Sequence, residues 1–253
     1  MIRDFLGAYS GAWRYALACP LLFAVPVAVE FVQHVIEMRI GMYDGFAAAQ
    51  AVEMHPARMG WGLIKTLSLV AALYWTARFL ILPGGAARAG RLEPAAVRLF
   101  ALVMLWSLVW TVALLWGGRW MSAAGLGDQA VAAGIAATLC LFVFDALLAP
   151  WKVGAALGNA ELGFVRSIQL VGRQIWWAMA FIVLAVLPPM ILHYAFFFLA
   201  IGAPESAAWA ILAVDSLLVG YLGAVIAAVN VAIARRAAAR AGLEIAPRSA
   251  ATA

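Results

Sequence analysis

Residues 207–233 read AAWAILAVDSLLVGYLGAVIAAVNVAI, a run that contains one acidic residue, Asp215, and no basic residue. An α-helix needs about 20 mainly apolar residues to cross the roughly 30 Å hydrocarbon core of a bilayer, and this run is long enough to do so. Small residues at Gly220, Gly223 and the alanines that follow give it a face for close helix contact, within one chain or across a dimer. The stretch therefore predicts a transmembrane helix.

Five more apolar runs of sufficient length precede it, at about 15–36, 62–82, 98–117, 130–149 and 175–200. Only 11% of the residues are charged, against roughly 25% in soluble globular domains, and the mean hydropathy is +0.98. The six spans leave too few of the 253 residues for a separate soluble domain. We therefore expect an all-α bundle of six transmembrane helices, formed as a single domain by residues 1–240 and followed by a flexible cytoplasmic tail at 241–253.

The 17 basic residues are divided unequally between the two sides of such a bundle. The opposite side from the termini holds only Arg39, Arg58, Lys65 and Arg119, and all the others lie on the side of the two termini. Because an excess of basic residues marks the cytoplasmic face, both ends are predicted to be cytoplasmic, in a bacterial inner membrane. Anionic headgroups along that face account for the pI of 9.6. Nucleic acid is not an expected partner, since no zinc-finger or RNP motif accompanies the charge.

Two cytoplasmic segments have the pattern of helices that lie in the membrane interface. The first carries apolar residues at helical spacing, Ile2, Phe5, Leu6, Tyr9 and Trp13. The second carries Phe164, Ile168, Val171 and Ile175. Such segments anchor a bundle or recognise lipids and partners. The basic residues predicted to contact the membrane surface are Arg88, Arg91, Arg166 and Arg173.

The end of the fourth span and the segment after it resemble a known arrangement. The residues that carry the resemblance are Asp145-Ala-Leu-Leu-Ala-Pro150, Gly154, Glu161, Arg166-Ser167, Gly172 and the tryptophan pair at 176–177. This order is similar to that of the uncharacterised six-helix bacterial inner-membrane proteins of the YciC type and of the membrane domain of glycerophosphodiesterases. The resemblance covers about 60 residues. It implies a six-helix fold and no catalytic residues, and the soluble phosphodiesterase domain is absent from this chain.

Ionisable residues inside the spans are the main candidates for function, because a charge at the bilayer centre costs roughly 2.5–3.5 kcal/mol. Glu30 and His34 lie four residues apart and share one face of the first span. His193 lies late in the fifth span and Asp215 early in the sixth, so all four are expected in the outer half of the membrane. Asp145 and Asn230 fall in the inner half and are predicted to form a second polar pair.

The outer group has two interpretations that the sequence leaves open. It could be a proton or cation site, or a metal site with two nitrogen and two oxygen ligands. Alternatively, the same side chains could only hydrogen-bond to one another and hold helices together. A single sequence does not fix the order of helices around the bundle, so convergence of the four residues is not predicted.

The chain lacks the usual signatures of an enzyme. It contains no GxSxG nucleophile elbow, no HExxH zinc motif and no P-loop. We expect no cofactor and no catalytic residue. The sequence favours a non-enzymatic membrane protein that supports lipid or envelope homeostasis or the assembly of a membrane complex, with a homodimer or another membrane protein as partner. The alternative is a small transporter or channel that uses Glu30, His34, His193 and Asp215.

Overall fold

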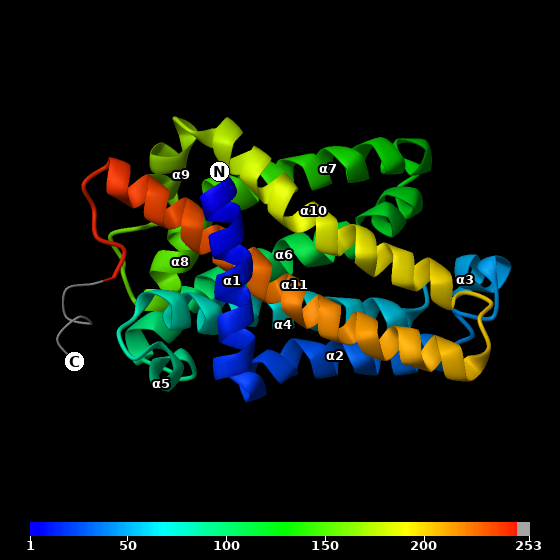
Figure 1. Ribbon diagram of the computed structural model, residues 1–253. Helices are drawn as coiled ribbons and strands as arrows, with labels where there is room; N and C mark the ends of the chain where they lie inside the picture. Colours follow the sequence, from blue (N-terminus) through cyan, green and yellow to red (C-terminus); the bar gives the residue numbers. More distant parts are fainter. Residues whose placement is uncertain (247–253) are drawn as a thin grey trace.

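The computed structural model describes residues 1–246, and all regular secondary structure in this range is helical. Six helices are long and apolar enough to cross a membrane (Figure 1). They are α2 (Pro20–Arg39), α4 (Pro56–Ile81), α6 (Pro94–Ala123), α7 (Gly127–Leu147), α10 (Ile175–Ala200) and α11 (Glu205–Arg240). The prediction of an all-α fold with six candidate spans is confirmed, and the chain has the features of a multi-pass membrane protein.

Five shorter helices connect or flank these spans. They are α1 (Ile2–Ala18), α3 (Phe46–Val52), α5 (Gly85–Ala89), α8 (Ala149–Leu157) and α9 (Phe164–Gly172). Figure 1 shows α5, α8 and α9 at one end of the long helices and α3 at the other. In the same view α1 crosses the long helices almost at a right angle. Its buried face consists of small residues and Tyr15, whereas Ile2, Leu6 and Trp13 are exposed. An exposed apolar face is what an interfacial helix requires.

The first span begins later than the sequence predicted. Residues 15–18 belong to α1, and the chain bends at Cys19 before α2 starts at Pro20. Cys19 leaves helical geometry with φ −129° and ψ 54°. Proline is well suited to the first turn of a helix because the backbone N–H that it lacks has no intrahelical partner there. The apolar run at 15–36 therefore contains the end of one helix and the start of another.

Helix α11 is the centre of the bundle. It is buried along most of its length, and α1, α2, α4, α8 and α10 all pack against it. Close approach depends on its glycines: a Cβ atom at Gly220 would overlap the Val27 side chain of α2, and one at Gly223 would meet Leu69 of α4. The small-residue face is thus used inside the monomer, where lipid offers no hydrophobic driving force and close packing stabilises helix pairs.

The hairpin of α6 and α7 lies at the edge of the bundle. These two spans are the least buried of the six. Trp106 of α6 makes edge-to-face ring contacts with Phe144 of α7 and Phe164 of α9. Most of the remaining apolar surface of this hairpin is not covered by the described part of the chain.

The segment after the fourth span is a buried helix and not only a loop. Every residue of α8 is buried. Ser167 of α9 connects its start to the end of α7, since the Ser167 hydroxyl donates to the Leu147 carbonyl at 2.8 Å and accepts from the Trp151 N–H at 3.0 Å. The serine that follows the Pro-ended span therefore satisfies backbone groups at the break between two helices.

The first residues of the predicted flexible tail are held against the bundle. Asn159 donates from Nδ2 to the carbonyl oxygens of Glu244 at 3.3 Å and Ile245 at 2.9 Å. Ile245 and Ala246 also contact the core cluster around α8. The chain is therefore fixed as far as residue 246, because its backbone carbonyls meet a buried amide. The rest of the predicted tail lies outside the described residues.

Candidate functional site

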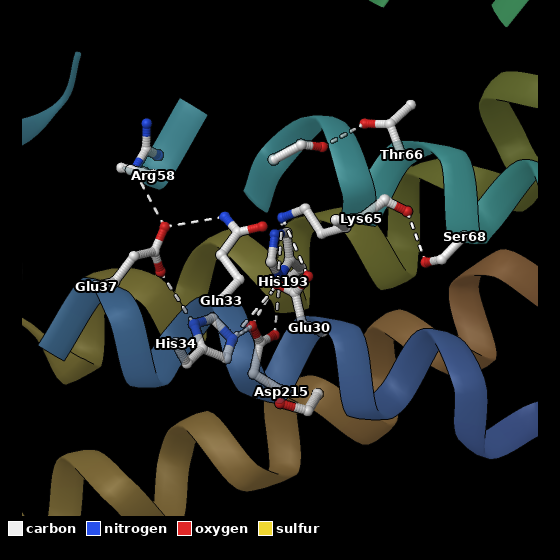
Figure 2. A network of polar contacts seen from close by, with 12 residues as sticks. Glu30, Gln33, His34, Glu37, Arg58, Lys65, Thr66, Ser68, His193 and Asp215 are labelled. Atoms are coloured by element: carbon white, nitrogen blue, oxygen red, sulfur yellow. Dashed lines mark hydrogen bonds and ion pairs between the residues drawn. The ribbon is translucent and has the colours of Figure 1, made fainter. Parts of the chain in front are cut away.

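One face of α2 carries four buried polar side chains. Glu30, Gln33, His34 and Glu37 follow the spacing that stacks residues on a single helical face, and none is more than 5% exposed. Glu30 and Glu37 are separated by seven residues, which is about 10 Å along the axis. Figure 2 shows this face turned toward α4, α10 and α11. The polar stripe therefore lies in the interior of the bundle.

Asp215 of α11 connects this stripe to α10. Its Oδ2 atom lies 3.1 Å from His34 Nε2. His193 Nδ1 lies 2.8 Å from Oδ1 and 2.9 Å from Oδ2 of the same carboxylate. Asp215 is fully buried, whereas His193 is 18% exposed. One carboxylate thus contacts two histidines that come from helices far apart in the sequence (Figure 2).

His34 has a carboxylate at each ring nitrogen. Nε2 faces Asp215 and also lies 3.4 Å from Glu30 Oε1. Nδ1 lies 3.1 Å from Glu37 Oε2 and 3.0 Å from Tyr43 Oη. A neutral imidazole has only one N–H, and an ionised carboxylate only accepts hydrogen bonds. Hydrogen bonds between His34 and carboxylates at both of its nitrogens therefore require an imidazolium or a proton on one of those carboxyl groups. In the neutral Nε2–H form, Nδ1 accepts from the Tyr43 hydroxyl instead.

Two cations of α4 complete the surroundings of the carboxylates. Arg58 Nε donates to Glu37 Oε1 at 3.1 Å, and Lys65 Nζ lies 3.2 Å from each oxygen of Glu30. The carboxylates of Glu30, Glu37 and Asp215 thus share the cluster with two basic side chains. One further proton, on a histidine or shared with a carboxylate, makes the group electrically neutral. A neutral group is favoured in a low-dielectric interior, because unpaired buried charges are costly.

Tyr43, in the connection after α2, closes the cluster at the end of the bundle near α3. Its hydroxyl donates to Glu37 Oε2 at 2.8 Å. Burial, together with the neighbouring Glu37 carboxylate, raises the pKa of Tyr43 far above its ordinary value. Tyr43 therefore remains a neutral hydrogen-bond donor. We call the residues described so far the ionic cluster: Glu30, Gln33, His34, Glu37, Tyr43, Arg58, Lys65, His193 and Asp215.

The structure brings together all four residues of the predicted outer group, Glu30, His34, His193 and Asp215 (Figure 2). Sequence reasoning missed Glu37, although it lies three residues after His34 and seven after Glu30 on the same face. It also missed Arg58 and Lys65 as partners, and placed them only on the side of the bundle that has few basic residues. The signal available in the sequence was that Arg58 and Lys65 lie in the long helix that directly follows the one carrying the acidic residues.

The predicted second pair of Asp145 and Asn230 does not form. Asp145 instead makes an ion pair with Lys152, one turn into α8. The Asn230 amide donates to the Ile226 carbonyl of its own helix at 2.9 Å. The break between α7 and α8 turns the chain so that Lys152 approaches Asp145, and a cation is a stronger partner for a carboxylate than an amide.

A metal ion could use part of the ionic cluster. Glu30, His193 and Asp215 each offer one ligand atom, and these atoms lie within 4.8 Å of one another. Glu30 Oε2 is buried without a hydrogen bond, which leaves a lone pair for such a ligand. The Lys65 ammonium group lies beside the same carboxylate, however, and a cation at that position competes with a metal. His34 is engaged on both nitrogens and is not part of this ligand group.

Comparisons with protein families, with curated proteins and with solved structures found no similar protein. The resemblance to the six-helix YciC-type proteins and to the glycerophosphodiesterase membrane domain therefore stays a prediction.

Proposed function

We propose that this chain is a small membrane transporter that binds and releases a proton, or exchanges it for a cation, at the ionic cluster. The observation that carries the proposal is the position of His34, which has carboxylate oxygens at both ring nitrogens. Such a group holds one proton that several acceptors share. Ionisable residues inside membrane helices are rare, and in pumps and transporters they form proton relays and ion pathways.

The contacts define a chain along which a proton can move. His193 contacts Asp215, Asp215 contacts His34, and His34 contacts Glu37. Glu37 in turn accepts from Tyr43 and Arg58 near the end of the bundle. Each neighbouring pair consists of one group that can give a proton and one that can accept it. Loss of the shared proton leaves the cluster with one net negative charge, which a bound cation would neutralise.

A second candidate function is support of lipid or envelope homeostasis, or of the assembly of a membrane complex. It is favoured by the complete pairing of the charged groups, since every carboxylate of the cluster has a cationic or histidine partner. In this case the cluster holds α2, α4, α10 and α11 together and transports nothing. The exposed α6–α7 hairpin would then offer the surface for a partner. We propose a bacterial inner membrane as the location in both cases, with the termini in the cytoplasm.

The two candidates differ in what removal of a carboxylate does. In liposomes that contain a pH-sensitive dye, the purified protein should carry protons down an imposed gradient. Asp215→Asn and Glu30→Gln keep the shape and one hydrogen-bond acceptor but cannot take up the proton. Each should lower the flux by about tenfold or more if the cluster is the pathway. The flux would be repeated with sodium, potassium and magnesium gradients to find the exchanged cation.

Glu205→Gln is the matched control, because Glu205 is an exposed carboxylate at the start of the same helix as Asp215. It should leave the flux unchanged. Melting temperatures of all three variants in detergent show whether each protein is folded. If the unaltered protein carries no flux above that of empty liposomes, and the cluster variants only melt at lower temperature, the transport proposal is wrong and the structural candidate stands.

A further inference from the structure

A pocket of about 730 Å³ opens at the end of the bundle opposite the ionic cluster. Its lining residues belong to α9, to the last turns of α11 and to the segment before α10. Figure 1 shows these elements at the same end of the bundle. Its lining includes Arg166, Arg173 and Arg240. No acidic residue of the described chain lines it. The pocket therefore has a concentrated positive charge with no internal counter-charge.

Two of the three lining arginines have unused hydrogen-bond donors. Among the described residues, the Arg166 guanidinium makes only one long contact, 3.5 Å to Gln169. The guanidinium of Arg173, an exposed residue, makes no hydrogen bond or ion pair within residues 1–246. A guanidinium presents five N–H donors in a planar fork that matches the oxygens of a phosphate. Both groups are thus available to a ligand.

Within the described part of the chain, the Gln174 side chain also has a hydrogen-bond donor that is not used, while its acceptor is used twice. Its Oε1 atom accepts from Arg236 at 3.2 Å and from Arg240 at 3.1 Å. Its Nε2 amide is buried without an acceptor among residues 1–246, in a residue that is only 7% exposed. Gln174 is also the N-cap residue of α10, and its side chain does not cap the helix. The positive end of a long helix therefore lies at the same pocket, and such ends favour anions.

Apolar surface lies next to this charge. Leu170 is part of the lining, and Val165 of α9 and Trp176 of α10 are strongly exposed close by in the chain. Arg236 stacks over the Trp177 ring at 4.2 Å, which fixes that arginine beside the pocket. A ligand for this pocket should combine an anionic head with an apolar body. Basic pockets between helices at the membrane surface bind the headgroups of anionic lipids.

We propose that this pocket is a specific binding site for the phosphate of an anionic phospholipid headgroup. The site is separate from the ionic cluster and does not depend on transport. It also differs from general attraction of arginines to the membrane surface, because the proposal requires one lipid at one place. Arg166 and Arg173 would contact the phosphate directly, while Gln174 and Arg240 form the wall behind it.

The test is native mass spectrometry of the full chain in detergent, titrated with phosphatidylglycerol or with phosphatidylcholine of the same acyl chains. One phosphatidylglycerol should be retained in preference to phosphatidylcholine. Arg173→Gln should weaken that retention about fivefold, and the double variant R166Q/R173Q about 25-fold. Arg173→Lys, which keeps the charge but not the fork, should restore only part of the affinity.

Arg91→Gln is the control, since it removes one exposed positive charge at the same end of the bundle but outside the pocket. Equal loss of lipid in R91Q and R173Q would overturn the proposal in favour of unspecific surface attraction. Inorganic phosphate is the second arm. If millimolar phosphate displaces the lipid, or binds alone with the same dependence on Arg173, the pocket holds a free anion and the lipid assignment is wrong.

Discussion

Arg78 is fully buried. Burial of a charged side chain is costly unless it is paired and hydrogen-bonded. Its guanidinium donates to the Glu93 carboxylate at 2.6 Å and to the carbonyl oxygens of Arg88 and Ala156 at 3.1 and 3.2 Å. It thereby connects α4 to α8 and to the segment before α6. These three acceptors match the donors of a planar guanidinium, and a lysine ammonium on a flexible stem does not reproduce that fork.

We therefore expect Arg78→Lys to destabilise the protein by about 2–3 kcal/mol, because buried carbonyls lose charged donors. Arg98→Lys is a suitable control, since Arg98 is exposed and its guanidinium bonds, within residues 1–246, only to the Pro94 carbonyl of its own helix. Denaturation in mixed micelles would give the free energy of unfolding of each variant. Equal stability of the two variants would show that the fork of hydrogen bonds around Arg78 contributes nothing.

At the residue scale, the intervals between residues in the sequence predict some contacts of the ionic cluster and not others. The four-residue interval of Glu30 and His34 correctly indicated that they share a face. The same rule applied to Glu37 would have extended the stripe by one turn. The contact of Asp215 with both histidines was not readable, because it depends on the positions of three separate helices.

At the scale of single elements, α2 and α11 are held close together by a glycine. A Cβ atom at Gly220 would overlap the Val27 side chain, whose branched carbon has little freedom to move away. We predict that Gly220→Ala costs about 1–3 kcal/mol of stability, as overpacking of a tight core does. Gly134→Ala in α7 should cost nothing, since no neighbouring atom lies within 4 Å of the position that its new Cβ would take.

The measurement is again denaturation in mixed micelles, with both variants in parallel. Because α2 also carries the polar stripe, the displacement in Gly220→Ala should lower proton flux together with stability if the transport proposal is right. A Gly220→Ala protein as stable as the Gly134→Ala protein would mean that the two helices can separate at no cost.

At the scale of the whole molecule, the distribution of basic residues bears on the orientation of the bundle in the membrane. The uneven distribution of basic residues predicts that both termini face the cytoplasm. In a C19A/C140A background, a cysteine at Ala239 near the end of α11 should react with a membrane-impermeant maleimide only after the cells are opened. A cysteine at Ala124, in the turn between α6 and α7, should react in intact cells. The reverse pattern would invert the topology.

Several properties followed from the sequence alone. A helix in lipid satisfies its backbone hydrogen bonds internally, so an apolar run of about 20 residues is enough to predict a span wherever it occurs. Six spans, the all-helical class and the small-residue face of the last helix were therefore predictable from local pattern. The ends of the helices were less predictable from the sequence. The bend at Cys19 and the buried helix α8 depend on proline positions and on contacts such as that of Ser167 with the end of α7.

Only the tertiary structure decided which polar residues meet. Helix order and rotation in a membrane bundle are set by packing between elements distant in the sequence, and no periodicity records them. That packing places His34 between Asp215 and Glu37. It pairs Asp145 with Lys152 and not with Asn230. It also brings Arg166, Arg173 and Arg240 together around one pocket. The sequence determined which chemical groups enter the membrane, and the fold determined their partners, because pairing requires side chains of different helices to share the same few ångströms of space.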